Sequence, residues 1–195
     1  MKCGWCHNSD LVISTKFPKA LSVDEIEKIL IDRVLNFSKY FCISGGEPTI
    51  QSDILPFCTF LNKVLGGRIK LDTNGRSPRI LKDLIPYLDY IAMDIKESPL
   101  KEKRSPILDS IKIIQDSNIK HLFRTTVVPG LVKEKDIIEI SSLMEKDDIY
   151  YLQQYTPSEN IIDPSYRNLI PESKVILGKY REVLLKRCKD VFIRS

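Results

Sequence analysis

In the stretch Tyr40-Phe41-Cys42-Ile43-Ser44-Gly45-Gly46-Glu47-Pro48-Thr49 an apolar run ends abruptly at two glycines and a carboxylate. A short apolar run bounded by glycine and proline is typical of a buried β-strand. Four runs of the same kind follow at intervals of about 20–30 residues, the length of one strand-and-helix unit. The predicted strands are Tyr40–Ser44, Arg68–Thr73, Tyr90–Ile95, His121–Val128 and Ile149–Tyr155.

Helical patterns occupy the stretches between these strands. Ser22 and Glu25 have the spacing of a capping box, and Ser105, which precedes a proline, is a favourable N-cap. Further apolar faces at helical spacing follow Pro78 and return near the C-terminus. Alternating strands and helices predict an α/β protein with a parallel sheet, closed or open, in a single domain that covers residues 1–195.

The carboxyl ends of parallel strands are the places where function collects in such folds. After the first strand, Gly45 and Gly46 let a ligand approach the backbone closely, and Glu47 can accept hydrogen bonds from an ammonium group. A plain strand-to-helix turn, which often carries glycine, is the alternative. After the second strand, Asp72-Thr73-Asn74-Gly75 has the composition of a tight turn or of a polar site.

Charged side chains interrupt the third and fourth strands. Asp94 and Lys96 stand two residues apart, and they form either a salt bridge across the mouth of a barrel or part of a binding site. Arg124 stands in an otherwise apolar strand and needs a partner, because an unpaired buried charge is costly. That partner is either Asp72 or Asp94 in a structural ion pair, or it is a bound anion.

The chain has five cysteines, and an odd number in a cytosolic protein argues against a disulfide framework. Cys42 and Cys58 lie in apolar patterns that predict core positions. Cys3 and Cys6 form a C-x-x-C pair, whose thiolates can bind one metal centre. Half a zinc site, a redox pair and chance are the alternatives, although no second C-x-x-C completes a zinc site.

The string Cys3-Gly4-Trp5-Cys6-His7-Asn8 resembles the second half of the C-x3-C-x2-C motif of radical S-adenosylmethionine (SAM) enzymes. In that family three cysteines hold a 4Fe–4S cluster, whose remaining iron binds SAM. The resemblance makes Cys3 and Cys6 the second and third ligands. The first ligand would lie two residues ahead of Met1, so we expect an N-terminal truncation that also removes the family's first strand.

The strand ends are similar to the same family, in the type that activates glycyl-radical enzymes. The resemblance implies a partial (β/α) barrel of about five parallel strands. It implies that Gly45-Gly46-Glu47 binds the SAM amino group, and that Asp72 and Thr73 lie near SAM or help to hold a monovalent cation. The residues that it assigns to SAM are Ser44, Gly45, Gly46, Glu47, Asp72, Thr73, Asn74, Asp94, Lys96, Arg124 and Gln154.

The fifth strand favours one partner. Leu152-Gln153-Gln154-Tyr155 resembles activators of anaerobic ribonucleoside-triphosphate reductase, whereas activators of pyruvate formate-lyase tend to have Leu-Pro-Tyr-His. The resemblance implies reductive cleavage of SAM to a 5′-deoxyadenosyl radical that abstracts hydrogen from a glycine of the partner, with a flavodoxin or ferredoxin-type electron donor. The alternatives are a pyruvate formate-lyase activator, a small-molecule enzyme of the deazaguanine type, and a non-catalytic remnant without one cluster ligand.

Composition sets the remaining bounds. The 195 residues carry 30 lysines and arginines and 26 acids, which gives a net charge of +4. The basic residues are scattered rather than gathered in a stripe, which argues against a nucleic-acid partner. No apolar run approaches the roughly 18–20 residues that span a bilayer, and the polar opening does not resemble a signal peptide. The sequence therefore predicts a cytoplasmic protein without a membrane partner.

Overall fold

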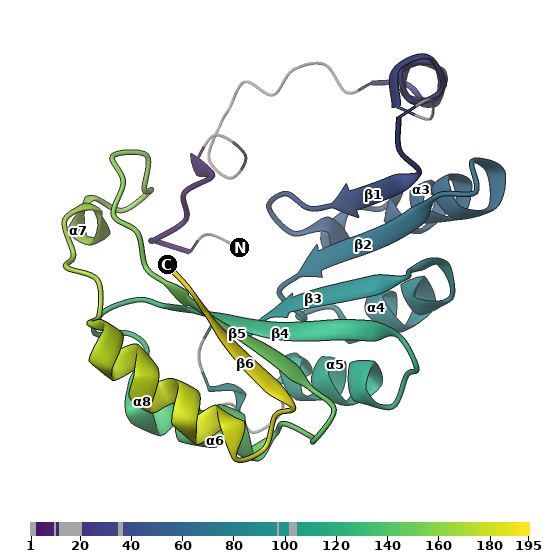
Figure 1. The fold of residues 1–195 in the computed structure, drawn as a ribbon. Coiled ribbons are helices and arrows are strands. Elements are labelled where there is room, and N and C mark those ends of the chain that lie inside the picture. The colour runs from purple at the N-terminus through teal and green to yellow at the C-terminus, as the bar shows by residue number, and fades with distance from the viewer. Residues whose placement is uncertain (1–2, 10, 12–20, 35–36, 97, 102–104) are drawn as a thin grey trace.

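The computed structural model describes residues 3–9, 11, 21–34, 37–96, 98–101 and 105–195. Within these residues six strands form one sheet in the order β1-β2-β3-β4-β5-β6, and every neighbouring pair is parallel (Figure 1). This confirms the predicted α/β fold with sequential strand-and-helix units. The strands are β1 (Tyr40–Ile43), β2 (Arg68–Thr73), β3 (Tyr90–Asp94), β4 (Lys120–Val127), β5 (Ile149–Gln154) and β6 (Asp190–Arg194).

Strand β6 is the one that the sequence pattern does not predict. Its apolar run is only Val191, Phe192 and Ile193, and so short a run cannot be separated from a helix end by periodicity. It pairs in register with β5, where Tyr150 lies opposite Val191, and both of these side chains are buried. The sheet is therefore one strand wider than expected.

The longer helices between the strands lie along the outside of the curved sheet (Figure 1). The capping box predicted at Ser22 is present, since Glu25 N donates to Ser22 Oγ and Ser22 N donates to Glu25 Oε2. Ser105 is an N-cap residue, as predicted, but its side chain makes no capping hydrogen bond. None of the described helices is long and apolar enough to cross a membrane.

The described α-helices are α2 (Val23–Ile29), α3 (Ile54–Thr59), α4 (Pro78–Leu84), α5 (Pro106–Gln115), α6 (Glu134–Ser142), α7 (Pro164–Arg167) and α8 (Lys174–Leu185). Short 3₁₀ and π-helical turns are η1 (Leu30–Val34), η2 (Pro48–Ile50), η3 (Phe60–Val64), η4 (Ile85–Tyr87) and η5 (Pro99–Lys101). The turns η1 and η3 directly continue α2 and α3, so these two helices are longer than their α-helical parts.

The main core lies between the sheet and the helices. Along β2, Ile69 and Leu71 are fully buried, whereas Lys70 and Asp72 are only partly buried. The alternation arises because successive side chains of a strand point to opposite faces of the sheet. Charged side chains therefore gather on the face that the helices leave open, and this positions the candidate site.

Strand β1 is an edge of the sheet within the described part of the chain. Its residues alternate between exposed and partly buried positions, and Tyr40 is 72% exposed. Cys42 is exposed, so its predicted core position is wrong. The reason is the phase of β1, which turns Cys42 to the open face, where Lys70 Nζ lies 3.9 Å from its Sγ. Cys58 on α3 is fully buried, as predicted.

Candidate functional site

Glu47 lies just after β1 and joins the exit of β1 to the exit of β2. Its Oε1 accepts hydrogen bonds from Thr49 N at 3.1 Å, Thr49 Oγ1 at 2.6 Å and Thr73 Oγ1 at 2.7 Å. Its Oε2 accepts from Asn74 N at 2.7 Å. The residue is 7% exposed, and a buried carboxylate is tolerated when its oxygens are paired in this way. We call Glu47, Thr49, Thr73 and Asn74 the Glu47 clamp.

The predicted residues around the clamp divide into buried and exposed ones. Thr73 and Asn74 are buried, and Thr73 Oγ1 also accepts from Gly75 N at 3.2 Å, so both residues hold the loop after β2. In contrast, Ser44–Gly46 is exposed. Gly45 has a φ of +149°, a conformation that favours glycine. The backbone of Ser44–Gly46 is thus the part of the β1 exit that a ligand can approach.

Charged side chains of β2, β3 and β4, with Lys96 just beyond β3, form a network on the open face of the sheet. Arg124 Nε donates to Asp94 Oδ1, and Arg124 Nη2 lies 3.4 Å from Asp72 Oδ2. Lys70 Nζ lies 2.6 Å from Asp72 Oδ1, and Lys96 Nζ lies 3.8 Å from Asp94 Oδ2. The structural ion pairs that the sequence leaves open are therefore present. We call these five residues the charged network.

Arg124 is the centre of this network. Burial alone would lower the pKa of Arg124, but the hydrogen bond and charge of Asp94, and the charge of Asp72, raise it above its ordinary value. At the outer end, the side chains of Asp94 and Lys96 are 28% and 35% exposed. The ammonium of a zwitterionic ligand can replace a lysine or arginine beside an aspartate of the network, and its carboxylate can replace an aspartate beside Arg124 or Lys96. Each buried charge then keeps a partner of opposite sign.

Strand β5 turns its two glutamines to opposite faces of the sheet. Gln153 pairs in register with Thr126, whose Oγ1 lies 3.5 Å from Gln153 Oε1, on the face of the charged network. Gln154 points the other way, and its Nε2 donates to Glu172 O at 2.9 Å. Strand alternation therefore gives the predicted SAM residue Gln154 a structural partner, and Gln153 is the amide that shares the face of the site.

The cysteine loop, residues 3–8, lies on the segment that follows β5. Cys6 N donates to Cys3 O at 3.1 Å, which closes the loop into a turn. Asp163 N donates to the carbonyl of the residue after Cys3 at 2.9 Å, and the Trp5 ring packs on Tyr166. The sequence does not point to Asp163 or Tyr166, since they lie far along the chain and no spacing pattern connects them with the cysteines.

The two cysteines fit part of an iron–sulfur site. Both thiols are partly buried and belong to one turn. Across the described residues, no group of three or more His, Cys, Asp or Glu side chains is placed to hold a metal ion. The part of the chain that the structure describes thus supplies two thiolates, whereas the motif that it resembles uses three.

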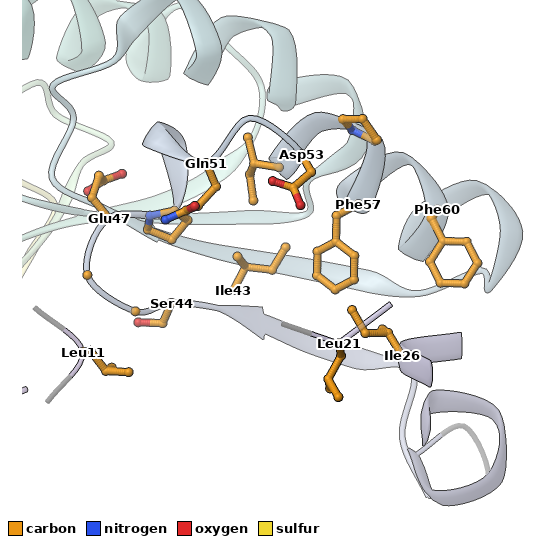
Figure 2. A pocket seen from close by; sticks show the side chains of 15 residues that line it. Leu11, Leu21, Ile26, Ile43, Ser44, Glu47, Gln51, Asp53, Phe57 and Phe60 are labelled. Carbon is orange, nitrogen blue, oxygen red and sulfur yellow. The ribbon is translucent and has the colours of Figure 1, made fainter. Parts of the chain in front are cut away.

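An apolar hollow of about 570 Å³ lies beside the exit of β1 (Figure 2). Leu21 and Ile26 lie on one side of it, Phe57 and Phe60 lie on the other, and the Ser44–Gly46 loop contributes to its lining. The hollow meets the predicted site at that loop and at the clamp carboxylate, and the charged network does not line it. Its lining suits an apolar group, so the hollow alone does not define a site for a charged ligand.

Comparisons with known proteins agree with this arrangement. The Radical SAM superfamily matches residues 1–143. A Methanocaldococcus jannaschii protein that is named as a glycyl-radical enzyme activating enzyme is 30% identical, over 100% of this chain and 85% of its own length. The 7-carboxy-7-deazaguanine synthase of Thermococcus kodakarensis is 23% identical, over 74% of this chain and 66% of its own length.

A solved structure has the same fold. It is a domain of a pyruvate-formate lyase-activating enzyme from Bacteroides vulgatus, with a TM-score of 0.60 and 14% identity over 80% of this chain and 98% of that domain. At this identity the likeness shows the fold alone. Because the superfamily matches most of its length and a 30% identical relative spans all of it, the chain belongs to the radical SAM superfamily, whose members are enzymes that use SAM and a 4Fe–4S cluster.

Proposed function

We propose that this protein is an activating enzyme that generates a glycyl radical on anaerobic ribonucleoside-triphosphate reductase. The observation that carries the proposal is the 30% identity with the glycyl-radical enzyme activating enzyme of M. jannaschii, which spans the whole chain. The choice of the reductase is supported by Leu152-Gln153-Gln154-Tyr155, which resembles its activators. In this proposal residues 1–195 act as one cytoplasmic domain, and a flavodoxin or ferredoxin-type protein supplies electrons.

SAM would bind where the exits of β1 to β4 meet. The exposed backbone of Ser44–Gly46 would accept hydrogen bonds from the amino group of SAM. Arg124 or Lys96 would bind the carboxylate of SAM in place of Asp94, their partner in the structure. Glu47 and its clamp would act on SAM by fixing the distance between the β1 and β2 loops. The amide of Gln153 lies on the same face and is available to hydrogen-bond a base.

The cluster would bind at Cys3, Cys6 and one further thiolate, which none of the described cysteines is placed to supply. When bound, the cluster and SAM supply the radical that removes a hydrogen atom from the partner's glycine. The chain's own residues would bind and orient SAM and keep water away from it.

A specific observation favours one other function. The similarity to 7-carboxy-7-deazaguanine synthase favours a radical SAM enzyme that acts on a small molecule. A non-catalytic remnant that binds SAM or a partner is a second alternative. Activation of pyruvate formate-lyase is a third possibility, which differs from the proposal only in the partner.

Electron paramagnetic resonance distinguishes these functions. The chain is extended by Met-Cys-Ala ahead of Met1, which completes C-x3-C-x2-C with Cys3 and Cys6. The protein is reconstituted with iron and sulfide without oxygen, and is then mixed with SAM, dithionite and either the reductase or formate-lyase. We expect a glycyl-radical doublet with the reductase, and no doublet from a control with a Met-Ser-Ala extension.

Each other outcome points to one alternative. A doublet with formate-lyase alone would move the assignment to that partner. If neither partner gives a doublet but SAM is cleaved, a small-molecule enzyme is favoured. If SAM is bound and never cleaved, the remnant is favoured.

A further inference from the structure

We propose that Tyr166 is a positioning residue for the cysteine loop, and that glycine stands at position 4 because Tyr166 lies against it. The inference rests on the proposed function only in taking Cys3 and Cys6 as the metal ligands. It concerns how the fold sets the geometry of the two thiols before any metal is present.

Two backbone hydrogen bonds join the loop to the segment ahead of α7. Asp163 N donates to Gly4 O at 2.9 Å, and Ile162 N donates to Cys6 O at 3.4 Å. Because the accepting carbonyls belong to loop residues, the segment holds the backbone that carries the thiols. The loop closes on itself at the same place, where Cys6 N donates to Cys3 O.

Tyr166 is held in place from several sides. It packs in a small hydrophobic cluster, separate from the main core, with the buried residues Val128, Tyr155 and Ile161. The ring of Trp5, which lies between the two cysteines, is 6.0 Å from the Tyr166 ring between centroids. Tyr155 Oη donates to Tyr166 O, and Tyr155 is 1% exposed. The exit of β5 therefore fixes the ring on which the cysteine loop lies.

This close approach leaves no room for a side chain at Gly4. A Cβ at that position would lie 2.8 Å from Tyr166 Cε2 and 3.3 Å from Asp163 Cβ. The clash is with the side of an aromatic ring that its neighbours hold, so the ring cannot swing away cheaply. Any larger residue at position 4 must lift the loop from its segment or displace the ring.

The spacing of the Cys3 and Cys6 thiols can be measured in protein that holds no cluster, through the affinity of the two cysteines for phenylarsine oxide. The arsenic oxide reacts with two thiols to give two As–S bonds and water, and no oxidant or reductant is consumed. The full chain is used with Cys42→Ser, because Cys42 is an exposed thiol outside the loop. Cys58 and Cys188 are buried. Tight binding then requires both thiols of the loop at the right spacing.

Gly4→Ala is expected to weaken arsenical binding about tenfold, since overpacking strain shifts an equilibrium by that order. Tyr166→Leu, which removes the ring from the loop, is expected to weaken binding about threefold. The double variant should bind like Tyr166→Leu alone, because the clash is gone with the ring. Tyr166→Phe keeps the ring and should bind like the parent. Gly178→Ala is the matched control, since a Cβ there meets nothing within 4 Å.

Thermal unfolding of each variant, followed by circular dichroism, separates loop geometry from global stability. Parent affinity in a folded Gly4→Ala variant would overturn the proposal. A double variant that binds much more weakly than Tyr166→Leu would overturn the role of the ring. If Gly4→Ala does not fold, unchanged affinity in Tyr166→Leu would overturn the proposal instead. A missing glycyl radical would count against the proposed function and would leave the arsenical result unaffected.

Discussion

Replacing Glu47 by glutamine tests the Glu47 clamp with the smallest change of shape. One carboxylate oxygen becomes an amide nitrogen, which donates instead of accepting. In place of Oε2, the nitrogen would face Asn74 N–H across 2.7 Å. In place of Oε1, it would face Thr49 N and the hydroxyls of Thr49 and Thr73. Either orientation sets a donor against a donor where the residue is 7% exposed.

The magnitude follows from the first, less costly orientation. It removes one hydrogen bond to a charged group, which contributes about 1.5–3 kcal/mol, and it leaves one buried N–H unpaired, which costs about 1–3 kcal/mol. The two effects overlap, so we expect the free energy of unfolding to fall by about 2–4 kcal/mol. In a chain of this size that corresponds to a loss of about 5–15 °C in Tm.

Urea titration followed by circular dichroism measures the change, and calorimetric titration of SAM runs beside it. Glu159→Gln is the control, because Glu159 is exposed and its replacement should stay within about 0.5 kcal/mol of the parent. A direct ligand role for Glu47 predicts weaker SAM binding with unchanged stability. A Glu47→Gln variant as stable as the Glu159→Gln control would therefore refute the clamp.

Gly75→Ala should be less stable than Gly130→Ala by about 1–3 kcal/mol in thermal unfolding. Both positions have positive φ, but of the two only a Cβ at Gly75 meets a neighbour, the side chain of Met93, which is fully buried and has little room to move. Equal losses would contradict this. Both ring nitrogens of His121 face acceptors, a backbone carbonyl and the Asp148 carboxylate. Burial lowers the pKa of His121, but these partners raise it overall. The stability that it contributes is complete below the ordinary pKa of about 6.5 and is lost as pH rises through the raised folded value, so Tm should fall across that window in the parent and not in His121→Phe. Finally, the 195-residue chain without an extension should retain iron and sulfide poorly after anaerobic reconstitution, and a stable stoichiometric cluster would be evidence against this account.

Five of the six strands can be predicted because each apolar run ends in glycine or in charged and polar residues. Strand β6 could not be predicted, since its apolar run of Val191, Phe192 and Ile193 is too short to be separated from a helix end by periodicity. Cys42 shows a second limit, because the phase of β1 turns its side chain to the face of the sheet that the helices leave open. Burial at an edge depends on tertiary neighbours, which local pattern does not contain.

The sequence predicts where the candidate SAM site lies, at the exits of the strands, but it does not predict what each residue of the site contacts. Parallel topology brings the strand exits together, so Glu47 and Asn74 were expected in one region. The sequence does not show that the Glu47 carboxylate turns inward and accepts a hydrogen bond from Asn74 N in the loop after β2. A shift of one residue in strand phase exchanges Gln153 and Gln154 between the two faces. Tyr166 lies beyond any local pattern, because it meets the cysteine loop from the opposite half of the chain.

Isotope transfer shows whether this protein takes a hydrogen atom from a glycine of a partner enzyme. The reductase is prepared with glycine that is deuterated at the α-carbon, and it is mixed without oxygen with the extended chain, SAM and dithionite. Mass spectrometry then measures deuterium in the 5′-deoxyadenosine that forms. We expect one deuterium in each 5′-deoxyadenosine, in an amount that matches the glycyl radical. 5′-Deoxyadenosine without deuterium, formed equally from deuterated and ordinary reductase, would contradict the claim.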